Sequence, residues 1–233
     1  MPKPTSAGST LRVSTTLVLS VWVAACQPQP AAVATSESCV VPRISSSFER
    51  LPPAARPADE TPRAGALPTP VLSDAEGVAA GDCIRPALFR IAAGSSEAQL
   101  RDSVGWTRIG TQFYRSEHGR YIEVATNALA AGYRRFEDGP PLPVGAVIKK
   151  HSFRAFQSGA IRPGPQFLME KMPPGYDPRV GDWRFTLIAD TGATVGETRG
   201  RDGEKVEYCV ACHRSARRQD FLFFIPPDYR AKN

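Results

Sequence analysis

The chain has 233 residues, which is enough for one large domain or two small ones. Its hydrophobic content of 42% allows a packed core, and its formal net charge of +6 is mild. The basic residues are scattered, with Arg217-Arg218 as a local pair, so the sequence predicts no nucleic-acid partner.

Residues 1–26 have the pattern of an export signal peptide. Basic residues precede an apolar run at 13–25, which is shorter than the roughly 20 residues that a spanning helix needs. The run ends in Val-Ala-Ala directly before Cys26, which resembles a bacterial lipobox. We therefore expect a periplasmic protein, attached to a bacterial membrane by a lipid on Cys26. Ordinary signal cleavage, with Cys26 incidental, is the alternative.

Residues 27–84 are rich in Pro and Ala and show no sustained helical or alternating pattern, which predicts an extended tether. A folded domain is expected over 85–233. Its predicted helices cover 95–104, 128–138 (capped by Asn127) and 207–218, and its predicted strands cover 107–115, 120–127, 146–156, 165–172 and 183–190, with one turn at His118-Gly119. This order predicts an α+β domain, mainly an antiparallel sheet with a few short helices.

The stretch "YCVACHR" at 208–214 holds a C-x-x-C-H motif, the attachment signature of haem c. Cys209 and Cys212 would each form a thioether with a porphyrin vinyl group, and His213 would ligate the iron. A zinc site would need two further ligands at suitable spacing. A thioredoxin-like redox pair would be expected after a first strand rather than near the end of the chain.

The motif is followed by no methionine that could bind the far side of the iron. Met169 and Met172 both precede it. The sequence therefore predicts five-coordinate iron with an open face, which binds or activates small molecules. An electron-relay cytochrome with Met169 as the sixth ligand is the alternative.

Five cysteines are present, and the assignments to Cys26, Cys209 and Cys212 leave Cys39 and Cys83. An oxidising compartment favours a disulfide between them. Two independent thiols are the alternative.

Several stretches together resemble the cytochrome P-460 family, which includes the cytochromes c′-beta: "HGRYIEVATN", "LPVGAVIKKHSF", "FLMEKMPPGYDPRVGDWRF" and "YCVACHRSARRQDFLF". The resemblance covers roughly residues 100–225 and implies a mostly antiparallel β fold, commonly a homodimer, that encloses one covalent, five-coordinate haem c. It implies oxidation of hydroxylamine, with nitric oxide as part of that chemistry, and a periplasmic cytochrome as electron partner. It also implies a third link between the haem and a lysine five positions after a glycine, which Gly145 and Lys150 match.

The strand pattern agrees with a pocket position for Lys150. Ala146, Ile148 and Lys150 share one face of the predicted strand, and Lys149 and His151 share the other. A solvated Lys-Lys pair at a strand end is the alternative. By the resemblance, Lys150 would tune the haem and take part in catalysis.

On the distal side, the family pattern places Phe167 where an enzyme would want a carboxylate base. Glu170 is the candidate base, although it would reach the pocket only if the register slipped by one residue. An apolar Phe cap resembles the gas-binding cytochromes c′-beta, which bind nitric oxide without turnover. Arg120 is expected to pair with a haem propionate, and Trp183 is expected to pack on the porphyrin.

Overall fold

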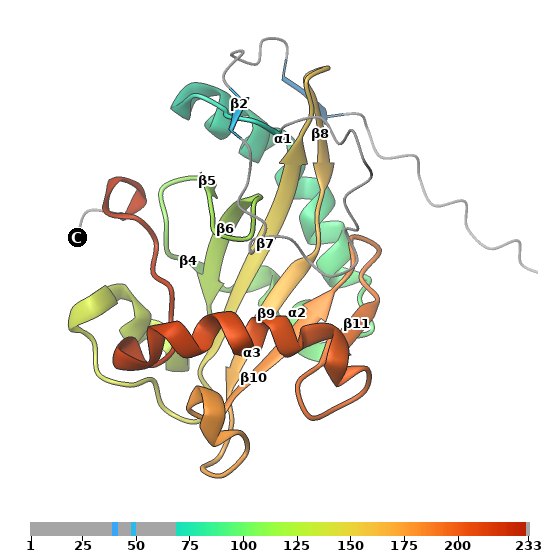
Figure 1. Cartoon of the computed structure of the whole chain (residues 1–233). Coiled ribbons are helices and arrows are strands. Elements are labelled where there is room, and N and C mark those ends of the chain that lie inside the picture. Colours follow the sequence, from blue (N-terminus) through green and yellow to red (C-terminus); the bar gives the residue numbers. More distant parts are fainter. Residues whose placement is uncertain (1–38, 42–47, 50–68, 232–233) are drawn as a thin grey trace, which may run out of the picture. The chain divides into compact units, whose positions relative to one another are not determined.

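The computed structural model describes residues 39–41, 48–49 and 69–231, so the predicted signal, Cys26 and most of the predicted tether lie outside the described residues. One antiparallel sheet dominates the described part (Figure 1). Its strands are β1 (Cys39–Val40), β4 (Thr107–Arg108), β5 (Tyr114–Arg115), β6 (Tyr121–Thr126), β7 (Val147–Ala155), β8 (Ala160–Pro163), β9 (Gln166–Lys171), β10 (Trp183–Ile188) and β11 (Thr194–Glu197). A separate pair is formed by β2 (Phe48–Glu49) and β3 (Thr69–Pro70).

The α-helices are α1 (Asp74–Ala93), α2 (Ala98–Asp102) and α3 (Glu207–His213). The 3-10 helices are η2 (Ser103–Gly105), η3 (Ala128–Asp138), η4 (Pro178–Val180), η5 (Gly203–Val206), η6 (Arg214–Gln219) and η7 (Pro227–Tyr229). The predicted class, α+β with a mainly antiparallel sheet, is confirmed. The helices were expected to be short, whereas α1 has 20 residues.

The long strand β7 is the centre of the sheet. One of its edges pairs with β6, and its other edge pairs with β8 and then β9. In this register Lys150 lies opposite Val124 on one side and Phe167 on the other. The sheet continues from β9 to β10 and β11.

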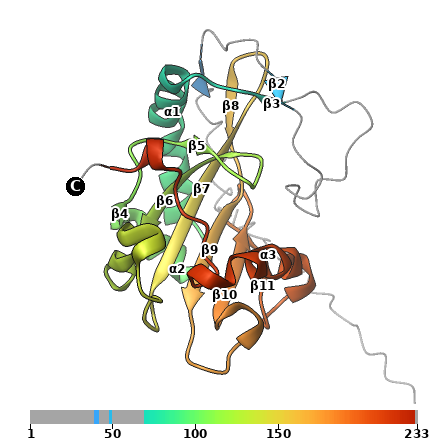
Figure 2. The same cartoon turned by 60° about the vertical axis from the view of Figure 1, so that its left-hand side comes forward.

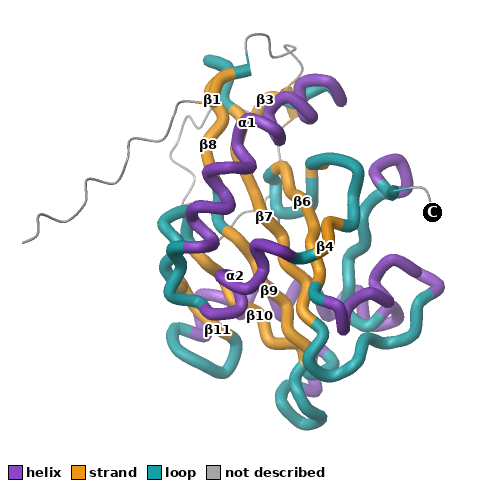
Figure 3. The backbone as a smooth tube through the Cα atoms, turned by 180° about the vertical axis from the view of Figure 1, so that it is seen from behind, coloured by secondary structure: helices purple, strands orange, loops and turns teal. Residues whose placement is uncertain are grey.

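Helices cover both faces of this sheet, so nearly every residue of β7 is buried. Seen from behind, α1 and α2 lie over one face (Figure 3). Leu88 of α1 and Phe153 of β7 belong to one buried cluster there. Across the other face, α3 passes in front of β9 and β10 (Figures 1 and 2), and its Val210 shares a cluster with Met169.

Helix α1 corrects the predicted start of the folded domain. The tether was expected to reach residue 84, but α1 begins at Asp74. A capping box starts it: Glu76 N donates to Ser73 Oγ at 3.4 Å, and Ser73 N donates to Glu76 Oε2 at 2.7 Å. At Gly81 the helix approaches Phe113 so closely that a Cβ would lie 2.7 Å from the Phe113 Cδ2 atom. Small residues on the buried face therefore let α1 pack tightly, and they also weaken its apolar pattern.

A disulfide joins Cys39 to Cys83, as predicted. Cys83 lies on α1, and Cys39 lies on β1, which pairs with β8. The bond therefore fastens the edge of the sheet to the helix that covers it.

Most of the other predicted elements are present with shifted bounds. The helix expected at 95–104 is α2 followed by η2, and Asn127 caps η3 by accepting a hydrogen bond from Ala130 N at 3.0 Å. The strand expected at 107–115 is divided into β4 and β5. Among the described residues, no helix is long and apolar enough to cross a bilayer.

Candidate functional site

Helix α3 carries the C-x-x-C-H motif over a single turn. Cys209 and Cys212 are three residues apart and so lie on neighbouring positions of the helix. Cys209 is buried, Cys212 is exposed, and neither is in a disulfide. His213 is the last residue of the helix and is buried. The motif thus has one exposed residue, Cys212, and two buried residues, Cys209 and His213.

The imidazole of His213 is held by a backbone acceptor. Its Nδ1 atom lies 2.7 Å from the carbonyl oxygen of Phe221. Because a carbonyl only accepts, Nδ1 carries the proton and Nε2 has a free lone pair. Burial lowers the pKa of His213 to about 3. The ring is therefore neutral at pH 7, with Nε2 available as a ligand.

The segment after η6 is fixed by Asp220. Its Oδ1 lies 2.6 Å from Lys171 Nζ, and its Oδ2 accepts from Leu142 N at 2.9 Å. Its backbone carbonyl accepts from Trp183 Nε1 at 2.8 Å. These contacts hold the chain reversal that presents the Phe221 carbonyl to His213.

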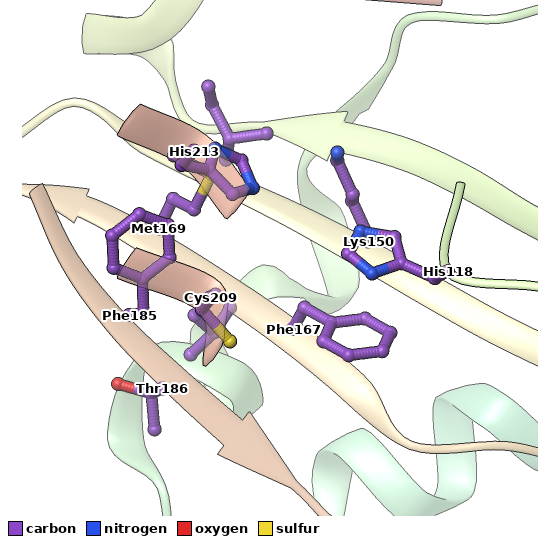
Figure 4. Close-up of a pocket in the computed structure, with 10 residues that line it drawn as sticks. His118, Lys150, Phe167, Met169, Phe185, Thr186, Cys209 and His213 are labelled. Carbon is purple, nitrogen blue, oxygen red and sulfur yellow. The ribbon is translucent and has the colours of Figure 1, made fainter. Parts of the chain in front are cut away.

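His213 and Cys209 line a pocket of about 340 Å³, measured out to its open mouth, between α3 and the sheet (Figure 4). The lining is mostly apolar and consists of His118, Ile148, Lys150, Phe167, Leu168, Met169, Phe185, Thr186, Cys209 and His213.

The structure places Lys150 in this pocket, as the pleat predicted. Ile148 and Lys150 line it, whereas Lys149 points to the opposite face and donates to Ser103 Oγ at 2.6 Å. Burial lowers the pKa of Lys150. Among the described residues, the Lys150 side chain has no hydrogen bond or ion pair. A buried amine in that condition favours the neutral or a chemically modified form.

Phe167 lines the pocket, as expected, and it is the register partner of Lys150 on the neighbouring strand. Glu170 does not line the pocket, because it forms an ion pair with Arg184 instead. The register of β9 against β7 is not shifted: Glu170 pairs with Val147, just as Phe167 pairs with Lys150. Glu170 is therefore not turned into the pocket. The candidate base is therefore separated from the other candidate residues.

Trp183 also lies outside the pocket lining. It is fully buried in the main core cluster, and Lys171 Nζ lies 5.0 Å from its ring centroid. It supports the segment around Asp220 rather than the pocket wall.

Arg120 lies in a neighbouring groove on the same face of the sheet. The groove is lined by Arg120, Arg154, Phe156, Arg162, Pro163, Gly164, Pro165, Leu187, Ala189, Asp190 and Val195. It adjoins the pocket, because Leu187 pairs with Phe167 of the pocket wall. Arg120, Arg154 and Arg162 therefore lie at the end of the pocket beyond Phe167. Their guanidinium groups are suited to binding carboxylates.

The sequence pattern gave no role to His118, yet the structure places it in the pocket. Its ring stacks on Phe167 with centroids 4.5 Å apart and planes 18° apart. Burial lowers the pKa of His118 well below its usual value. A single histidine in a turn belongs to no recognisable sequence motif. Its place in the pocket becomes evident only when the β5–β6 hairpin is folded against β9.

The geometry disfavours the two competing readings of the cysteine motif. A redox-active thiol has a lowered pKa, whereas burial raises the pKa of Cys209 to about 12. A zinc site needs four converging ligands, but among the described residues no group of three or more His, Cys, Asp or Glu side chains is placed to hold a metal ion.

The chain matches no family model and no curated protein. The resemblance to the cytochrome P-460 family therefore stays a prediction from the quoted motifs.

Proposed function

We propose that this protein is an exported c-type cytochrome with one covalent haem, attached through Cys209 and Cys212 and ligated by His213. One observation carries the proposal: the buried thiol of Cys209 and the free Nε2 of His213 line one apolar pocket. The donor set fits haem c, since two thiols supply thioethers and a neutral imidazole supplies the iron ligand. The Phe221 carbonyl would orient that imidazole by accepting a hydrogen bond from Nδ1, as carbonyl and carboxylate acceptors do for metal-bound histidines.

The rest of the pocket also suits a porphyrin. Ile148, Met169 and Phe185 offer an apolar surface for its faces. The groove lined by Arg120, Arg154 and Arg162 adjoins the pocket, and its guanidinium groups would be available to bind the haem carboxylates. Lys150 lines the same pocket, and a covalent link from it to the porphyrin would remove the unfavourable burial of its charge.

The bound haem would supply an iron centre that exchanges electrons and binds a small nitrogenous ligand. The P-460 resemblance points to hydroxylamine or nitric oxide, with a periplasmic cytochrome as electron partner. Lipid attachment at Cys26 and a homodimer belong to the same proposal.

The second candidate is a nitric-oxide-binding protein without turnover. A specific observation favours it: Phe167 lines the pocket, whereas Glu170 is paired with Arg184 outside it. An enzyme that removes protons from hydroxylamine needs a base within hydrogen-bond reach.

The test is production of the full chain in a bacterial host that attaches haem c. Intact mass should show one haem, and the Cys209→Ala/Cys212→Ala double variant should lose it. A mass without haem would refute the proposal. Turnover of hydroxylamine with an electron acceptor, against binding of nitric oxide alone, then separates the two candidate functions.

A further inference from the structure

We propose that His118 is the polar side chain that hydrogen-bonds the small ligand in the pocket. This inference rests on the proposed function, and it fills the position for which the sequence offered only Glu170. It makes His118 a residue of the binding site rather than a surface histidine.

His118 enters the pocket from a different element than His213. It belongs to the turn between β5 and β6, and in Figure 4 its ring reaches in from the side away from α3. Both rings line the same space. A ligand held in that space would therefore meet His213 and His118 from different directions.

The turn holds His118 in a defined position. Gly119 N donates to the Ser116 carbonyl at 2.9 Å, Ser116 N donates to the Arg120 carbonyl at 2.9 Å, and His118 N donates to Ser116 Oγ at 3.3 Å. Gly119 has a φ of 69°, which glycine adopts without strain. With the ring stacked on Phe167, both the backbone and the imidazole plane are constrained. A constrained donor suits binding, since little entropy is lost when a ligand arrives.

The other polar side chains of the lining have other contacts or roles. Thr186 Oγ1 is directed to Glu197 Oε2 at 3.5 Å, and the proposed function uses Lys150, Cys209 and His213 for the haem. Among the described residues, neither ring nitrogen of His118 makes a hydrogen bond. A half-buried imidazole without a hydrogen-bond partner, aimed into a pocket, is suited to a polar ligand.

The test uses the haem-loaded full chain with carbon monoxide as the probe. A hydrogen bond from His118 to the bound ligand lowers the C–O stretching frequency and slows dissociation. We expect His118→Leu to raise that frequency and to speed dissociation about tenfold, which corresponds to the loss of one hydrogen bond. His118→Gln, which keeps a donor, should restore most of both values.

Two results would overturn the inference. One is an unchanged C–O band in His118→Leu. The other is a low-spin six-coordinate spectrum of the parent that becomes high-spin in His118→Leu, since His118 would then ligate the iron itself. Intact mass distinguishes failure of the proposed function from failure of this inference. Protein without haem refutes both, whereas an unshifted C–O band in haem-loaded protein refutes only the role of His118.

Discussion

The Nδ1 atom of His213 lies 2.7 Å from the carbonyl oxygen of Phe221, eight residues further along the chain. The ring is also enclosed by Phe185 and Phe223, whose centroids lie 4.9 and 5.0 Å from it. The site for the imidazole is thus formed by residues outside α3.

Replacing His213 with Gly should leave a cavity that free imidazole can occupy. The Phe221 carbonyl still accepts an N–H, and the two phenyl rings still enclose the ring. We expect the variant to lose the histidine-ligated haem spectrum and to regain it on addition of millimolar imidazole. Absorption spectra with and without imidazole measure this, and N-methylimidazole, which lacks the N–H, should rescue less well.

Replacing Lys150 with Met should abolish any red shift of the ferrous Soret band, because the third link to the haem would be lost. Lys149→Met is the matched control, since Lys149 is the neighbouring lysine on the opposite face, bonded to Ser103. The control should keep the parent band position. Equal spectra for the parent and Lys150→Met would contradict the lysine link.

Replacing Asp220 with Asn should lower the free energy of unfolding by about 3 kcal/mol, because it leaves Lys171 without its partner in a mostly buried pair. Asp202→Asn is the control. Asp202 also pairs with a lysine and also has a left-handed φ, 54° against 53°, but its pair with Lys205 is exposed. The control should change stability by less than about 1 kcal/mol. Urea unfolding monitors both, and equal effects would argue against the role of the buried pair.

Lys149 should make stability depend on pH in the alkaline range. Burial lowers its pKa from 10.5 to about 7, although nearby Glu123 opposes the shift. Between pH 7 and 10.5 the unfolded chain binds more protons at this site, so the folded state gains stability as pH rises. The parent should therefore gain up to about 5 kcal/mol relative to Lys149→Met across this window. Urea unfolding of both at several pH values measures it, and a constant difference would show that the lysine does not titrate there.

How far the sequence predicts the fold depends on the pattern available in each segment. The alternation in 146–156 was sufficient to place Lys150 and Lys149 on opposite faces of β7 correctly. Helix α1 was missed because its interior contains Gly77, Gly81 and Pro86 and follows a proline-rich stretch. Gly81 is explained only by the close packing against Phe113, which no local pattern contains.

The candidate site likewise contains residues that local sequence predicts and residues that only tertiary contacts place. The C-x-x-C-H motif was expected on a helix, which α3 confirms, and its role in holding haem stays a prediction. Glu170 and His118 depend on tertiary contacts instead: an ion pair to Arg184 draws one out of the pocket, and a hairpin brings the other in. Local sequence contains no information on those long-range partners.

The bond between Cys39 and Cys83 also determines how the domain would respond to mechanical force. A pull on the chain ahead of Cys39 would pass through the disulfide directly into α1 and, through β1, into β8. The residues between the two cysteines would bear no tension while the bond is intact. After reduction, the load would first peel β1 from the sheet edge and would then reach α1 at its first residue, Asp74, instead of at Cys83.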